Sequence, residues 1–125
     1  VVSVMVGHIA VVNHPEYSTG GAPATLSRRM VHDLLRDSLG FHGLIITDAM
    51  NMDAVDDFPQ ASLQAFKAGC DMMITPDSVE DFIARVKREV QQNPALMEQL
   101  RQSVRKIIRL KVCSGLIDIK RQNSV

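Results

Sequence analysis

The sequence predicts an α/β fold in which parallel strands alternate with helices. Three short apolar runs, at residues 1–6, 44–47 and 72–74, are each followed by a segment in which apolar residues recur at helical spacing. The runs are nearly continuous rather than alternating, which is typical of parallel strands buried on both faces. The order strand, helix, strand, helix, strand, helix, helix fills the 125 residues without repeats or low-complexity segments, so we expect one unit.

The first two predicted helices lie between the three strands. Ser27 is a favourable N-cap for a helix that Gly40 ends. The second helix covers about residues 60–68 and ends at Gly69, and its alanines recur at helical spacing, which favours close packing. The apolar face of the first helix comprises Met30, Val31, Leu34 and Leu35.

Two further helices follow the third strand. Ser78 and Asp81 form a capping-box arrangement at the start of one helix. Asn93 is the predicted N-cap of the other, which has Pro94 at its first position and extends to about Val112. Each helix has an apolar stripe. The stripes comprise Val79, Phe82, Ile83, Val86 and Val90 in the first helix, and Met97, Leu100, Val104, Ile107 and Ile108 in the second.

Composition excludes several classes of protein. The 14 basic and 14 acidic side chains are spread along the chain and give a formal net charge of zero, so no nucleic-acid partner is expected. The apolar runs are far shorter than the roughly 20 residues that span a bilayer, so no membrane span is expected. Cys70 and Cys113 have neither CxxC nor metal-ligand spacing, and we expect both to be buried as small apolar residues.

The start of the chain indicates that it is part of a longer protein. Val1 is not an initiator methionine, and an apolar strand begins at once without a preceding turn or cap. A targeting segment would precede this point, so the sequence leaves the cytoplasm and the periplasm both open as its location.

Residues at the carboxyl ends of the predicted strands are the candidates for a functional site. Loops at residues 7–25 and 48–59 follow the first two strands, and parallel α/β folds bind ligands at this edge. Asp48 directly follows the second strand, where a carboxylate could act as a nucleophile, a base or a metal ligand. The structural alternative is an Asp that accepts hydrogen bonds from the backbone of the next turn, and position alone does not decide between them.

His8 follows the first strand and is the second candidate. If the two strands are neighbours, the His8 imidazole and the Asp48 carboxylate meet at one edge, where they could orient a substrate hydroxyl. The alternative is a histidine bonded to the backbone. Met50 is expected to pack in the core. No metal-ligand spacing connects the four histidines, so no metal site is predicted; the remaining three are His14, His32 and His42.

Five segments stand in order along the chain: VMVGHI at 4–9, PATLS at 23–27, LLRDSLGFHGLIITDAMNM at 34–52, AFKAGCDMMI at 65–74 and VRKIIRLK at 104–111. In sequence and spacing they resemble the catalytic domain of glycoside hydrolase family 3. Within the family, the chain is most similar to the bacterial β-N-acetylhexosaminidase branch. It has TDAMNM at 47–52 and contains no Trp, whereas β-glucosidase-type members tend to have Trp directly after the nucleophile.

The resemblance implies a (β/α)8 TIM barrel, of which residues 1–116 form the last three β/α units and residues 117–125 a polar C-terminal tail. It also implies that Asp48 is the catalytic nucleophile, which attacks the anomeric carbon of a terminal N-acetyl-β-glucosaminide and forms a glycosyl-enzyme that water hydrolyses. His8 and Met52 are then expected to bind this carbohydrate substrate. No cofactor or metal is expected, because the mechanism needs only two protein groups and water.

The sequence also departs from the family. The resemblance implies an acid/base His on a loop with a KHxPGHG-type sequence, which these residues lack, and neither His8 nor His14 replaces it. Thr47 and Ala49 stand where many relatives have Ser and a second Asp. We therefore expect the isolated chain to be inactive. The alternative function is a non-catalytic barrel fragment that acts as a binding or assembly module. It would bind sugar or a partner, and its open edges would allow self-association or association with a complementary part. A phospho-acceptor or Mg²⁺-binding Asp in an open sheet is disfavoured, because no further acidic cluster accompanies it.

Overall fold

The computed structural model describes residues 1–118 as a three-stranded parallel sheet with helices packed around it. The strands are β1 (Ser3–Val6), β2 (Leu44–Ala49) and β3 (Met72–Ile74), and β2 is the central strand. The α/β class and the parallel order are thus as predicted. The helices are η1 (Ala24–Leu26), η2 (Arg29–Ser38), α1 (Asp53–Asp56), α2 (Ala61–Ala68), α3 (Val79–Gln92) and α4 (Pro94–Cys113). Part of the predicted tail, residues 119–125, lies outside the described residues.

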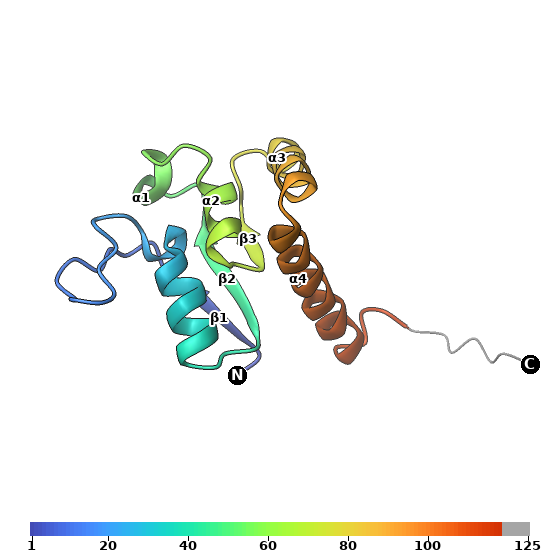
Figure 1. The fold of residues 1–125 in the computed structure, drawn as a ribbon. Helices are drawn as coiled ribbons and strands as arrows, with labels where there is room; N and C mark the ends of the chain where they lie inside the picture. The colour runs from blue at the N-terminus through green and yellow to red at the C-terminus, as the bar shows by residue number, and fades with distance from the viewer. Residues whose placement is uncertain (119–125) are drawn as a thin grey trace, which may run out of the picture.

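The buried core lies between the sheet and the helices η2 and α2. In Figure 1, η2 and α2 lie against the sheet, and α4 runs beyond β3. One face of α2 packs against β2 and η2, and its other face packs against α3 and α4 through Leu63 and Phe66. The first cluster comprises Val31, Ile45, Met50, Val55, Ala61, Ala65, Ala68 and Cys70. Helix α2 therefore holds the sheet and the last two helices together.

One expectation about the strands was wrong: they are not buried on both faces. Met5, Ile46 and Met72 lie side by side across the three strands. Met5 is 57% exposed and Met72 38%, whereas Ile45, the next residue on β2, is fully buried. Side chains alternate between the two faces of a strand, so the helices cover the face of Ile45. Within residues 1–118, no second layer covers the face of Met5.

Helix η2 is wound more widely than the α-helix that its sequence predicts. It has π-helical hydrogen bonding, and beyond its end Leu39 N–H donates to Leu34 O at 2.9 Å. The predicted boundaries are confirmed: Ser27 Oγ accepts from Met30 N–H at 3.4 Å, and Gly40 has a φ of 63°. Apolar spacing over ten residues does not separate the two windings, because both place one face on the core.

The caps of α3 and α4 are confirmed, but their apolar stripes are only partly buried. Ser78 Oγ accepts from Asp81 N–H at 3.2 Å, and Asn93 Oδ1 accepts from two N–H groups in the first turn of α4. Val86 and Val90 are buried because this end of α3 packs against α2 and α4. Among the described residues, Phe82, Met97 and Leu100 are partly buried against the same cluster. Four stripe positions are exposed: Val79, Ile83, Val104 and Ile108.

Two smaller expectations also need correction. The loop at residues 48–59 contains the short helix α1, which Val55 anchors in the core, and β2 extends through Ala49, so Asp48 lies in the strand rather than after it. Cys70 is buried as predicted, but Cys113, at the end of α4, is exposed. No helix in the described part of the chain is long and apolar enough to cross a membrane.

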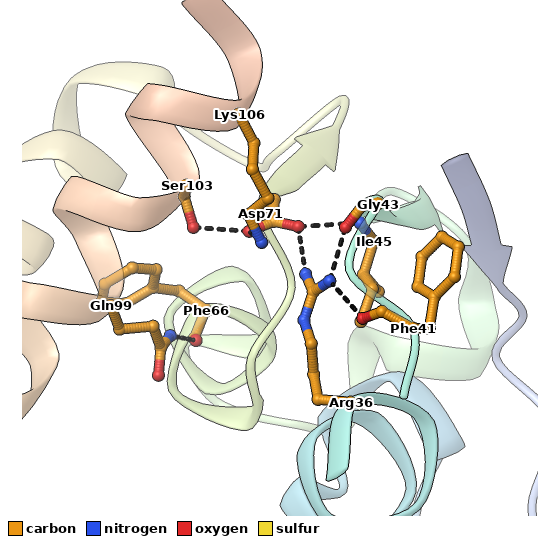
Figure 2. A network of polar contacts seen from close by, with 9 residues as sticks. All are labelled: Arg36, Phe41, Gly43, Ile45, Phe66, Asp71, Gln99, Ser103 and Lys106. Atoms are coloured by element: carbon orange, nitrogen blue, oxygen red, sulfur yellow. Dashed lines mark hydrogen bonds and ion pairs between the residues drawn. The ribbon is translucent and has the colours of Figure 1, made fainter. Parts of the chain in front are cut away.

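At the amino-terminal ends of β2 and β3, a buried carboxylate joins elements that are distant in the sequence (Figure 2). The side chain of Asp71 is 2% exposed and lies just before β3. Its Oδ2 accepts hydrogen bonds from Ile45 N–H at 2.8 Å and from the Arg36 guanidinium. Its Oδ1 accepts from Ser103 Oγ at 2.6 Å and pairs with Lys106 Nζ at 2.7 Å. One carboxylate thus connects η2, β2 and α4.

Arg36 extends this network to the loop before β2. Its Nη1 donates to Phe41 O at 3.1 Å and to Gly43 O at 2.5 Å. Gly43 is required there, because a Cβ at this position would lie 2.4 Å from Val2 O. On the far side of the network, Gln99 Nε2 donates to Phe66 O at 2.5 Å and ties α4 to α2 (Figure 2). Burial lowers the pKa of Lys106, and the hydrogen bond to Asp71 acts in the opposite direction.

We predict that Asp71→Asn lowers the free energy of unfolding by about 3 kcal/mol, because Arg36 and Lys106 lose their shared counter-charge in a partly buried setting. Glu89→Gln is the matched control. It breaks the Lys67–Glu89 pair, whose N···O distance is also 2.7 Å but whose side chains are 42% and 36% exposed. Urea unfolding followed by circular dichroism should show a loss of about 0–1 kcal/mol for this control. Equal losses in the two variants would contradict the assigned role of Asp71.

We also predict that the two cysteines differ sharply in reactivity. Burial raises the pKa of the Cys70 thiol to about 12, and the Asp71 carboxylate adds to this increase. Only about one Cys70 thiol in 10⁴ is then ionised near pH 8, and it is also inaccessible. A disulfide reagent should therefore modify one thiol of the folded chain quickly and the second only in denaturant. Cys113→Ser should remove the fast phase; a fast phase that survives this substitution would show that Cys70 is accessible.

Candidate functional site

Asp48 lies near the carboxyl end of the central strand. It is the last residue but one of β2, and its side chain is half-buried. Oδ1 accepts a hydrogen bond from Ala49 N–H at 2.8 Å. The structure therefore shows the backbone contact that the structural alternative predicts, while the other oxygen, Oδ2, is not used in that contact.

His8 lies at the same edge of the sheet as Asp48. β1 pairs with β2 in parallel, with Val6 opposite Thr47, so the chain that follows β1 reaches the end of β2. His8 Nε2 is 3.0 Å from Ala49 O, and Nδ1 is 2.8 Å from Thr25 Oγ1. The two strands are neighbours, as the prediction required. Both ring nitrogens of His8 contact protein groups, and Nε2 contacts the backbone of the residue directly after Asp48.

Thr25 is a site residue that the sequence reasoning did not single out. It lies in η1, is fully buried, and its Oγ1 is 3.0 Å from Gly7 O as well as close to the His8 ring. The PATLS segment that contains Thr25 contributed to the family resemblance. Its hydroxyl had no visible role in the sequence, because His8 is 17 positions away along the chain.

The turn after β2 brings Met52 and Asn51 to the same region. Met50 is buried in the core, as predicted, and its N–H donates to Ile74 O at 2.8 Å. Met52 is 42% exposed. Asn51 Oδ1 accepts from Thr75 Oγ1 at 3.0 Å, and Thr75, directly after β3, has a φ of 43°. This strained threonine connects the turns that follow two neighbouring strands.

The other histidines do not join this group. His14 Nδ1 accepts from the backbone N–H groups of Glu16 and Tyr17, at 3.2 and 3.0 Å, which closes a local turn in the long loop. His32, on η2, is 3.2 Å from a carboxylate oxygen of Asp33 and 3.3 Å from one of Asp37. Both carboxylates are exposed, so this cluster is explained by polar contacts on the surface of a helix.

The arrangement is that of a parallel α/β domain whose candidate site residues lie at the carboxyl ends of its strands, the edge at which such folds bind ligands. Residues 1–110 match the protein family described as "Glycosyl hydrolase family 3 N terminal domain". The chain belongs to this family.

Curated relatives include the β-hexosaminidase A of Pseudoalteromonas piscicida, 32% identical over 101 residues, which cover 71% of this chain and 17% of that protein. A second is the β-N-acetylglucosaminidase/β-glucosidase of Cellulomonas fimi, 30% identical over 126 residues, which cover 91% of this chain and 22% of that protein. The chain thus spans about a fifth of the length of these relatives. It is also similar to the crystal structure of a β-N-acetylhexosaminidase from Beutenbergia cavernae, with a TM-score of 0.74, 26% identity, and coverage of 88% of this chain and 33% of that one.

Proposed function

We propose that residues 1–116 form the last three β/α units of a (β/α)8 barrel that hydrolyses terminal N-acetyl-β-D-glucosaminides with retention of configuration, and that Asp48 is its nucleophile. The observation that carries the proposal is the Asp48 carboxylate, half-exposed at the carboxyl end of the central parallel strand, in a chain that belongs to family 3. Active sites of (β/α)8 barrels form at this edge.

The arrangement of the carboxylate suits an attacking group. Ala49 N–H holds Oδ1 at 2.8 Å, so we assign the attack on the anomeric carbon to Oδ2. As the new C–O bond forms, the glycosidic C–O bond breaks, and the leaving oxygen takes a proton from a general acid. Water then cleaves the glycosyl ester and gives its proton back to the same group, so the sugar leaves with its original configuration.

The second group of this mechanism is proposed to come from polypeptide outside these residues. The KHxPGHG-type sequence that the family resemblance leads us to expect is not among the 125 residues, and both nitrogens of His8 contact protein groups. We keep Met52 as a substrate-side residue, and for His8 substrate contact is the prediction against which a positioning role is tested below. His8 would then present a ring edge or face to the sugar, and Met52, 42% exposed, an apolar thioether surface.

An alternative function is supported by the uncovered face of the sheet. Met5 and Met72 are exposed on that face, and β1 is an edge strand. Unpaired edges and apolar faces favour association with another chain. We therefore keep, as second candidate, a non-catalytic barrel fragment that self-associates or complements another part.

The first prediction concerns the nucleophile. In the polypeptide that contains this chain together with the acid/base segment, Asp48→Asn should lower the hydrolysis of a 4-nitrophenyl N-acetyl-β-D-glucosaminide by about 10³-fold or more, because no covalent intermediate forms. Asp53→Asn, an exposed carboxylate on the following helix α1, is the matched control and should retain activity. Turnover by Asp48→Asn at the wild-type rate would exclude Asp48 as the nucleophile.

The second prediction separates the two candidate functions. The purified 125-residue chain should show no turnover of the same glycoside, because it lacks the general acid. Sedimentation or light scattering then measures its association. Hydrolysis that depends on Asp48 in the isolated chain would show that the acid lies within these residues. Association without activity in any longer polypeptide would favour the non-catalytic alternative.

A further inference from the structure

The His8 side chain meets the backbone of β2 where the regular pairing of that strand ends. β1 ends at Val6, opposite Thr47, and the pairing of β2 with β3 is irregular between Ile46 and Ala49. Just beyond this irregularity, His8 Nε2 lies 3.0 Å from Ala49 O. A carbonyl oxygen only accepts hydrogen bonds, so Nε2 carries a proton and donates it. A side chain thus supplies a hydrogen bond to the sheet after the backbone of β1 has ended.

This hydrogen bond completes a clamp on one peptide group. In the peptide that joins Ala49 to Met50, the C=O accepts a hydrogen bond from His8 Nε2. The N–H of the same peptide donates to Ile74 O at 2.8 Å. Both polar groups of that peptide are therefore held, one from the chain after β1 and the other from β3. A peptide fixed at both ends cannot rotate without breaking one of these bonds.

The clamped peptide adjoins the peptide whose N–H holds the Asp48 carboxylate, and the two share the Ala49 Cα. Ala49 N–H donates to Asp48 Oδ1 at 2.8 Å, so the orientation of Ala49 determines where this carboxylate is held. The other ring nitrogen of His8, Nδ1, lies 2.8 Å from Oγ1 of the fully buried Thr25, and this contact orients the ring. Contacts of this kind on the second ring nitrogen fix the orientation of a histidine.

We infer that His8 is a positioning residue that holds the Ala49–Met50 peptide and, through Ala49 N–H, the conformation of the Asp48 carboxylate. The inference rests on the proposed function for its catalytic meaning, since Asp48 needs one fixed oxygen to present the other to a substrate. The clamp itself is a property of the folded chain. Thr25 orients the ring and acts through His8.

The test uses two amide side chains that separate the two ring contacts. In His8→Gln, the longer amide brings an N–H group close to the place of Nε2 and keeps a donor for Ala49 O. In His8→Asn, the shorter amide reaches only the place of Nδ1 and leaves Ala49 O without that donor. Both variants remove the imidazole, so a difference between them reports on the bond to Ala49.

Amide hydrogen exchange on the complete 125-residue chain gives the readout. We expect His8→Asn to speed the exchange of the Ala49 and Met50 amides about tenfold, the effect of losing one hydrogen bond. His8→Gln should stay within about threefold of wild type. The Ile45 amide, which donates to Asp71 at the other end of β2, is the internal control and should not change in either variant.

The inference fails if His8→Gln and His8→Asn speed exchange equally, or if Ile45 exchanges faster together with Ala49, because either result indicates a general packing role. It also fails if neither variant alters Ala49 and Met50. Should His8→Asn not fold, the ¹⁵N spectrum of the wild-type ring decides: a proton on Nε2 supports the clamp, and a ring protonated only on Nδ1 overturns it.

Kinetics of the glycoside-hydrolysing polypeptide separate positioning from direct substrate contact. Positioning predicts that His8→Asn lowers kcat while KM stays within about twofold, and that His8→Gln restores much of kcat. A rise in KM with kcat unchanged would overturn positioning in favour of substrate contact. If Asp48→Asn is active, the proposed function fails, and hydrogen exchange still decides whether the clamp exists.

Discussion

The fold depends on one buried carboxylate. Asp71 has four partners, from η2, β2 and α4, and two of them are cations. A buried carboxylate is costly unless it is paired and hydrogen-bonded, so these elements can pack only in an arrangement that brings their donors to Asp71. The network gives the sheet and its helices a unique register at the amino-terminal ends of β2 and β3, in addition to the apolar burial that α2 provides.

The two ends of the sheet differ in kind. At the amino-terminal ends, the enclosed Asp71 carboxylate is paired with the two cations Arg36 and Lys106. At the carboxyl ends, the side chains of His8 and Asp48 are half-buried, and their hydrogen bonds are to backbone groups and to the buried Thr25 hydroxyl. Stability and function are commonly divided in this way between the two faces of parallel barrels. The carboxyl edge also holds a strained residue, Thr75, whose φ is 43°.

The exposed apolar residues show how the fold relates to the proposed barrel. The helix-covered face of the sheet is buried, whereas Met5 and Met72 on the other face are exposed. The interior of a (β/α)8 barrel is filled by side chains from alternate strands, so an arc of three strands would expose the residues that the remaining strands cover. The same residues that support the barrel also support association as the alternative function.

Local features were predictable from the sequence: the three strands, the caps at Ser78 and Asn93, the end of α2 at Gly69 and the place of Asp48 at the carboxyl edge of the sheet. These depend on apolar spacing and on residues a few positions apart. Only the tertiary structure decided the partners of Asp71 and His8, because Arg36 is 35 positions from Asp71 and Ala49 is 41 from His8. It likewise decided which apolar positions are covered. Spacing along the chain shows which face of an element is apolar, and only packing determines what lies against it.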